Sequence, residues 1–239
     1  MRTTLTTARQ PPTAHPYDDT DVIDARAPRF NQATVGLVSL AAVVTGWWPL
    51  LALLALQLAL GLRFGRRWCL PCVAYFELVQ PRIGEGKIED ARPPRFANMV
   101  GVVFLTGASV AYLAGVPVLG AVLGGVVAAL ALLSAVTGFC TGCEAYKLLA
   151  RLRGVRAGTV GAIDLAGLGA ADGGAVVVQF THPLCSDCHE LEQRLAAGPR
   201  PLHVVDVTRR PDLARRYHVA VVPTAFVVAG DGTVLERLA

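Results

Sequence analysis

Two long runs without a charged side chain most constrain the fold of this chain. Residues 30–62 and 96–143 contain no Asp, Glu, Lys, Arg or His, which gives 33 and 48 consecutive uncharged positions. A helix needs about 20 apolar residues to cross a bilayer, with a range of roughly 17–25. The second run is therefore long enough for two spans, and the first is long for one. The helices of a soluble bundle would carry a polar stripe, and these runs carry none.

Glycine and proline interrupt each run near its middle. The breaks are Gly-Trp-Trp-Pro at residues 46–49 and Ala-Gly-Val-Pro at residues 114–117. Glycine ends helices, and proline is tolerated in the first turn of the next one. The breaks predict two helical hairpins, and hence an α-helical membrane domain of four transmembrane helices over residues 22–153.

The flanking charges predict the orientation of these helices. Fifteen Lys and Arg residues lie outside the two runs within the first 156 residues, and the hairpin turns carry none. The positive-inside rule then predicts a multi-pass protein of the cytoplasmic membrane with both termini in the cytoplasm. Anionic lipid accounts for the basic charge, so the bilayer is an expected partner and nucleic acid is not. Residues 1–21 are expected to form a flexible tail, and the oligomeric state stays open.

The membrane region contains an internal repeat. Asp-Ala-Arg-Ala-Pro-Arg-Phe at residues 24–30 recurs as Asp-Ala-Arg-Pro-Pro-Arg-Phe at residues 90–96. A Cys-x-x-Cys pair and then a tyrosine follow each hairpin, so the sequence predicts tandem repeats over 24–78 and 90–149. Each repeat crosses the membrane twice, which relates the repeats by a pseudo-twofold axis along the membrane normal. Both cysteine pairs are then expected at the cytoplasmic interface: Cys69/Cys72 and Cys140/Cys143.

The composition changes after about residue 154. Residues 157–239 carry a net charge of −2, against +6 for the first 156 residues. A buried strand at 174–180 precedes Cys185-Ser186-Asp187-Cys188, and a helix, a strand, a short helix and two further strands are expected after it. We expect an α/β domain over 174–239, with residues 154–173 as a linker and possible first strand.

Residues from about 157 to 239 resemble a thioredoxin-like domain. The matching features are Phe180, the pair Cys185 and Cys188 at a helix start, and Val-Pro-Thr at residues 222–224. The resemblance implies that Pro223 is cis and faces the cysteines. The sequence departs from the family at Gln179, where a buried carboxylate is usual, and at Ser186-Asp187, where Gly-Pro is usual.

Residues from about 22 to 150 resemble a four-helix membrane family catalogued as domain of unknown function 4395. The matching residues are Asp24-Ala25-Arg26, Pro-Arg-Phe-Asn-Gln at residues 28–32, and the two paired cysteine motifs. The resemblance implies no settled activity. The family's association with thioredoxin-like and sulfurtransferase proteins implies thiol or sulfane-sulfur chemistry.

The three cysteine pairs predict thiol chemistry. A helix N-terminus lowers a thiol pKa, so Cys185 is the expected nucleophile and Cys188 the resolving thiol. We expect a membrane-bound thiol–disulfide oxidoreductase, or a persulfide relay of sulfur metabolism, with a thiol redox protein or a sulfurtransferase as partner and no required cofactor. On the cytoplasmic side the pairs are expected to be reduced. The expected catalytic residues are Cys185, Cys188, Pro223, Cys69, Cys72, Cys140 and Cys143.

Two other interpretations of the membrane-proximal pairs stay open. Cys69, Cys72, Cys140 and Cys143 together have the ligand set of one zinc or iron–sulfur site, and they also suit helix caps and packing. Asp24 and Asp90 fit helix starts. For Tyr75 and Tyr146, anchoring at the membrane interface is preferred over pairing with each other. Cys185 to His189 spells a haem-attachment motif, but we expect His189 to face solvent.

Overall fold

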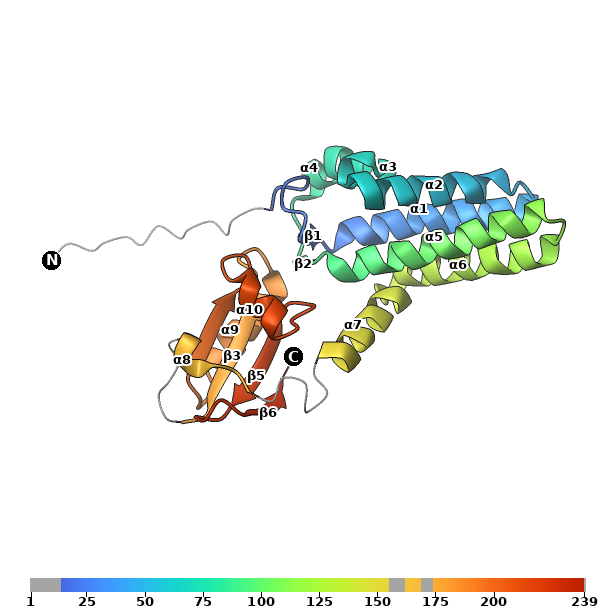
Figure 1. Cartoon of the computed structure of the whole chain (residues 1–239). Coiled ribbons are helices and arrows are strands. Elements are labelled where there is room, and N and C mark those ends of the chain that lie inside the picture. Colours follow the sequence, from blue (N-terminus) through green and yellow to red (C-terminus); the bar gives the residue numbers. More distant parts are fainter. Residues whose placement is uncertain (1–13, 155–161, 169–173, 239) are drawn as a thin grey trace.

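The computed structural model describes residues 14–154, 162–168 and 174–238. It consists of a long helical bundle and a smaller sheet domain that lies beside one end of the bundle (Figure 1). The bundle contains the two charge-free runs, and the sheet domain contains the carboxy-terminal part of the chain.

The bundle is built from two helical hairpins. α1 (Arg26–Thr45) turns into α2 (Pro49–Phe64), and α5 (Arg92–Leu113) turns into α6 (Pro117–Thr137). Gly46 ends α1 with a left-handed φ of 70°, and the two prolines stand in first turns, where their missing N–H costs no helical hydrogen bond. The predicted turns are confirmed. α1 packs on α6, α2 on α5, and α5 on α6.

Two of these four helices, α5 and α6, are long and apolar enough to cross a membrane by length and composition. α2 is apolar but has 16 residues, which span about 24 Å at 1.5 Å per residue, less than the ~30 Å bilayer core. α1 has 20 residues, but its first two turns contain Arg26, Arg29, Asn31 and Gln32. The prediction of four spans therefore finds support for two. On these two helices Val103, Val118 and Val136 are 69–84% exposed, as lipid-facing side chains would be in the absence of lipid.

A two-stranded antiparallel ribbon joins the starts of the two repeats. β1 (Val22–Asp24) pairs with β2 (Ile88–Asp90), with Val22 opposite Asp90. Asp24 accepts a hydrogen bond from the first-turn amide of Arg26 (2.9 Å), and Asp90 accepts one from that of Arg92 (2.8 Å). Their predicted place at the helix starts is confirmed, and their negative charge suits the positive end of the helix dipole.

The two repeats diverge after their hairpins. The second continues as one helix, α7 (Thr141–Gly154). The first begins with a 3₁₀ turn, η1 (Arg66–Trp68). It then continues without a gap through α3 (Leu70–Ala74), the π-helical η2 (Tyr75–Val79) and α4 (Gln80–Ile83), which ends at Gly84. Pro81 lacks the N–H that a regular α-helix would use at this point.

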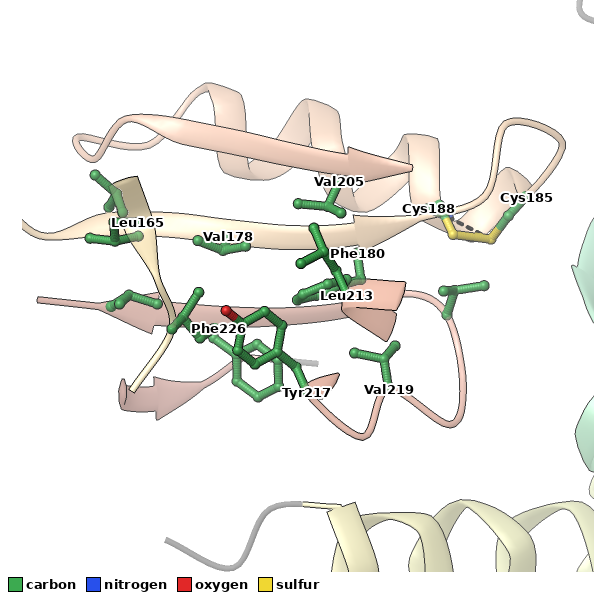
Figure 2. Close-up of a cluster of buried hydrophobic side chains, with 14 residues drawn as sticks. Leu165, Val178, Phe180, Cys185, Cys188, Val205, Leu213, Tyr217, Val219 and Phe226 are labelled. Carbon is green, nitrogen blue, oxygen red and sulfur yellow. Dashed lines mark hydrogen bonds between the residues drawn. A yellow bond between two sulfur atoms is a disulfide. The ribbon is translucent and has the colours of Figure 1, made fainter. Parts of the chain in front are cut away.

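The sheet domain has the strand order β4-β3-β5-β6. β3 (Val176–Thr181) runs parallel to β4 (Leu202–Asp206) and antiparallel to β5 (Thr224–Val228), which pairs with β6 (Val234–Arg237). Figure 2 shows the apolar core on this sheet, in which Phe180, Phe226 and Tyr217 meet. The strands, the helix α9 (Ser186–Ala196) and the short helix α10 (Pro211–Arg216) lie where the sequence predicts them.

Two expected boundaries change. Residues 14–21 belong to the expected tail, yet Arg66 donates hydrogen bonds to the carbonyl oxygens of Pro16, Asp19 and Thr20. Within the expected linker, Ala162 forms only an isolated bridge with Thr233, and α8 (Leu165–Leu168) is a helix rather than a first strand. The rest of the tail (1–13) and of the linker (155–161 and 169–173) lies outside the described residues.

Candidate functional site

The cysteine pair of the sheet domain lies at the start of α9. Cys185 is the N-cap residue, and its Sγ accepts a hydrogen bond from the Cys188 amide (3.2 Å). The two cysteines form a disulfide rather than the expected reduced pair, and Figure 2 shows this bond at one end of the apolar core. The peptide bond before Pro223 is cis, as expected.

Gln179 lies behind this pair on β3, in the position where the sequence comparison expected a carboxylate. Its side-chain amide is fully buried and donates to the carbonyl oxygen of Cys188 (2.8 Å). Its Oε1 has no partner within the described part of the chain. A neutral amide holds the backbone of α9 but, unlike a carboxylate, supplies no base for the resolving thiol.

The second membrane-proximal pair consists of two free thiols. Cys140 precedes α7, and its Sγ accepts hydrogen bonds from the Cys143 amide (3.3 Å) and from Gln32 Nε2 of α1 (3.2 Å). Ser134 of α6 in turn donates to Gln32 Oε1. These contacts hold Cys140 at the junction of α1, α6 and α7.

The same contacts make Cys140 the acidic thiol of its pair. Hydrogen bonding from Cys143, together with Gln32 and Ser134, lowers the pKa of Cys140 to about 6 against the opposing effect of burial. The pKa of Cys143 is raised, first by its hydrogen bond to Cys140 and then by burial. Cys140 is therefore the more acidic thiol and Cys143 the one that keeps its proton, which is the arrangement of a nucleophile and a resolving thiol.

One pocket brings this dithiol to the disulfide of the sheet domain. It has a volume of about 390 Å³ and is lined by Cys140, Cys143, Cys185 and Pro223. The charged side chains that line the pocket include both acidic and basic residues. These residues are Arg29, Glu89, Asp90, Glu144, Lys147, Asp187 and Arg237.

Hydrogen bonds from the second repeat hold the loop before Pro223. Asp90 Oδ2 accepts from the Val222 amide (3.1 Å), and Arg92 Nη1 donates to the carbonyl oxygen of Ala220 (2.8 Å). Tyr146 lies within 3.5 Å of that same carbonyl oxygen. We call Asp90, Arg92 and Tyr146 the docking triad.

The start of α9 makes further contacts with the ribbon. The Ile88 amide of β2 donates to Ser186 Oγ (3.0 Å), and Lys87 pairs with Glu190 (2.8 Å). The disulfide is thus placed from two sides: the docking triad holds the loop of Pro223, and the ribbon holds α9.

The first cysteine pair differs from the expectation in its oxidation state. Cys69 and Cys72 form a disulfide rather than a reduced pair. The expectation came from the reducing compartment, whereas the turn at the start of α3 brings the two Cα atoms to 5.1 Å, within bonding range. The pair lines a separate, small cavity of about 60 Å³, away from Cys185.

The four-cysteine metal site that the sequence left open is not assembled by this geometry. Cys69 and Cys72 are bonded to each other, and Cys140 and Cys143 line the pocket of Cys185 instead. Among the described residues, no three His, Cys, Asp or Glu side chains are close enough to hold a metal ion.

Tyr75 also corrects an expectation. It is 2% exposed, and its hydroxyl donates to Asp24 Oδ2 (3.0 Å), so it is a buried hydrogen-bonding residue and not an interfacial anchor. The Gly86 amide donates to the same oxygen (2.8 Å). Burial and the neighbouring carboxylate raise the pKa of Tyr75. His189 is exposed, as expected.

Sequence reasoning missed Gln32 and the docking role of Asp90. Gln32 is one of few hydrogen-bonding side chains in an uncharged run, but it lies 108 positions before Cys140. Asp90 was recognised in the repeat motif, and only the fold brings it to Val222, 132 positions later.

Comparison with known proteins gives one match. The profile of a protein family described as a domain of unknown function (DUF4395) matches residues 23–151. No curated protein and no solved structure matches the chain.

Proposed function

Because the chain belongs to the family described as a domain of unknown function (DUF4395), a description that assigns no activity, we propose a function from the geometry of the site. The protein is a membrane-bound thiol–disulfide oxidoreductase in which Cys140 and Cys143 exchange a disulfide with Cys185 and Cys188. The single observation that carries this proposal is the pocket shared by Cys140, Cys143, Cys185 and Pro223.

The sheet domain acts in this proposal as a thioredoxin-like domain. In support, its cysteine pair opens a helix, a cis proline lies at the same pocket, and the pair follows a central buried strand. Cys185 lines the pocket whereas Cys188 does not, so Cys185 is the sulfur that an incoming thiolate reaches.

The exchange proceeds in two balanced steps. The Cys140 thiolate attacks Cys185 Sγ, the Cys185–Cys188 bond breaks, and Cys188 leaves as a thiolate. Cys143 then gives its proton to Cys188 and attacks Cys140 Sγ, which releases the Cys185 thiolate. The products are a Cys140–Cys143 disulfide and a Cys185/Cys188 dithiol, and the same steps run in reverse transfer electrons the other way.

We further propose a multi-pass topology for the bundle, with the cysteine end and both termini in the cytoplasm. α5 and α6 supply two spans, and the shorter hairpin of α1 and α2 packs against them. The Lys and Arg residues that flank the two hairpins in the sequence, together with the uncharged hairpin turns, support this orientation.

The test traps the intermediate. In a Cys143→Ser/Cys188→Ser variant of the full chain, both resolving thiols are absent, so mild oxidation with diamide should join Cys140 to Cys185 in a stable mixed disulfide, found by mass spectrometry of non-reduced peptides. The matched control is Cys140→Ser/Cys188→Ser, in which only the less acidic Cys143 remains and the yield should fall. A link from Cys185 to Cys69 or Cys72 alone, or no link, would overturn the proposal.

A further inference from the structure

Cys140 has a second cavity on its other side. This cavity, of about 130 Å³, lies inside the helical bundle and shares Cys140, Gln32 and Ser134 with the pocket described above. Its remaining wall is largely apolar and includes Val35, Leu58, Phe104, Val127, Leu130 and Ala131. The reactive thiolate therefore stands between a charged pocket that faces the sheet domain and an apolar cavity that faces the bundle interior.

The cavity opens between α5 and α6. Val100, Phe104, Val126 and Leu130 line it and are each 37–43% exposed. These are the two helices long and apolar enough to cross a membrane. An apolar molecule dissolved in the bilayer would meet this opening directly.

The polar end of the cavity has an unused hydrogen-bond acceptor. Asn31 is 3% exposed and lines the cavity, and its Nδ2 donates to Asn98 Oδ1 (3.3 Å). Asn31 Oδ1 has no partner in the described residues. A buried carbonyl oxygen without a donor costs free energy, and a ligand with a hydroxyl group would remove that cost.

The proposed exchange also requires a second reactant. When the exchange runs in the direction that oxidises Cys185 and Cys188, it leaves Cys140 and Cys143 as a dithiol, which must be oxidised before the next exchange. A reactant that does so from the bundle side must be apolar and must accept two electrons, and a hydroxyl that it gains on reduction would satisfy Asn31 Oδ1. An apolar cavity of about 150 Å³ accommodates benzene, so this cavity of about 130 Å³ takes the edge of a quinone ring and leaves the rest of the ring in the opening between α5 and α6.

We propose that this cavity binds the ring of a lipid-soluble quinone, which oxidises Cys140 and Cys143. The inference rests on the proposed function, because that pair supplies the electrons. The Cys140 thiolate adds to a ring carbon, and the Cys143 sulfur then attacks Cys140 Sγ and breaks the carbon–sulfur bond. The two electrons leave on the quinol together with the Cys143 proton and one proton from water, and a quinol hydroxyl donates to Asn31 Oδ1. The products are a Cys140–Cys143 disulfide and one quinol.

The experiment uses a full-length Cys185→Ser/Cys188→Ser variant in lipid nanodiscs, which removes the exchange partner but keeps Cys140 and Cys143. The reduced protein is mixed with a short-chain ubiquinone, and quinone absorbance and the Cys140–Cys143 disulfide are followed. We expect one quinone reduced per protein and no reduction after an added Cys140→Ser change. No oxidation of the pair would overturn the quinone site, while leaving the Cys140–Cys185 trapping result untouched.

Cavity variants separate bound quinone from quinone that reacts through water. Asn31→Leu should slow the reaction by about fivefold to tenfold, the contribution of one neutral hydrogen bond, and Ala131→Phe should slow it by filling the cavity. Leu37→Phe on the exposed face of α1 is the matched control and should react as the parent does. If Ala131→Phe does not fold, the reaction rate of Asn31→Leu alone decides whether the cavity is the quinone site. Equal rates in all folded variants would overturn the cavity as the site.

Discussion

The two repeats of the bundle use the same residue types in different structural roles. In the first repeat Asp24 binds Tyr75 and Gly86, both from its own repeat or the segment that follows it, and the cysteine pair is a disulfide beside a small cavity. In the second repeat Asp90 and Tyr146 bind the loop before Pro223, and the cysteine pair is a dithiol at a large pocket.

The comparison indicates how a duplicated unit acquires a docking surface. In the first repeat, Asp24 accepts a hydrogen bond from the nearby Gly86 amide. In the second repeat, the equivalent Asp90 accepts one from the Val222 amide of the sheet domain. The first repeat can hold its loop because α4 and Gly86 follow closely, whereas α7 leads the chain away from the bundle (Figure 1). The second carboxylate is thus left for a different partner.

The largest difference between the repeats should appear when one cysteine is removed from each. Cys140→Ser should abolish exchange with Cys185, because it removes the thiolate at the shared pocket. Cys69→Ser should leave exchange within about twofold of the parent, since Cys69 lines another cavity. The rate is measured by quenching with an alkylating reagent and counting labelled cysteines. Equal losses in both variants would contradict the division of roles.

A smaller difference should follow from removing the two aspartates. Asp90→Ala removes the acceptor of the Val222 amide and should slow exchange by about tenfold, the lower end for a hydrogen bond to a charged group. Hydrogen–deuterium exchange should become faster at Val222.

Asp24→Ala is the matched control for this prediction. It leaves the Tyr75 hydroxyl buried without its acceptor and should lower the free energy of unfolding of the bundle by about 1–3 kcal/mol, while Val222 exchanges as before. Thermal unfolding in detergent measures the first effect. Loss of Val222 protection in Asp24→Ala alone would reverse our assignment.

The smallest effect concerns the acidity of Cys140. Its pKa is lowered to about 6, so its alkylation rate should rise as the pH rises through about 6 and level off above that. Gln32→Leu removes a donor that favours the thiolate, so the midpoint should shift upward. In a Cys143→Ala background the midpoint should lie above that of the parent, because the hydrogen bond from Cys143 is the largest cause of the lowered pKa. An unchanged midpoint on adding Gln32→Leu to this background would show that the amide does not act on the thiol.

Local sequence signals predicted local structure well. Gly46, Pro49 and Pro117 mark the hairpin turns, because a turn depends on the backbone preferences of a few neighbouring residues. The cis peptide before Pro223 was expected from the family resemblance of Val-Pro-Thr at residues 222–224 and not from backbone preferences. The sequence predicted four spans and the structure supports two by length and composition, since a charge-free run includes turns and a helix start as well as helix. The run at 30–62 includes most of α2, whose 16 residues extend beyond the run to Phe64.

The pairing of functional groups could not be predicted in the same way. The symmetry of the motifs suggested that Cys69/Cys72 meets Cys140/Cys143, whereas the fold brings Cys185 to the second pair instead. That choice depends on Asp90 and Arg92 contacting residues more than 120 positions away. Tyr75 was assigned to the interface because its partner Asp24 lies 51 positions earlier.

Among the described residues, the contacts that hold the sheet domain on the bundle are mostly single hydrogen bonds, with exposed ion pairs from Lys87 to Glu190 and to Asp187. Exposed pairs of this kind contribute about 0–1 kcal/mol and weaken in salt. Both parts belong to one chain, however, and a tether sustains an effective concentration in the millimolar range. Occupancy of the docked position is then governed by connectivity more than by affinity, so the domain can leave to meet another protein and return without competition from free copies.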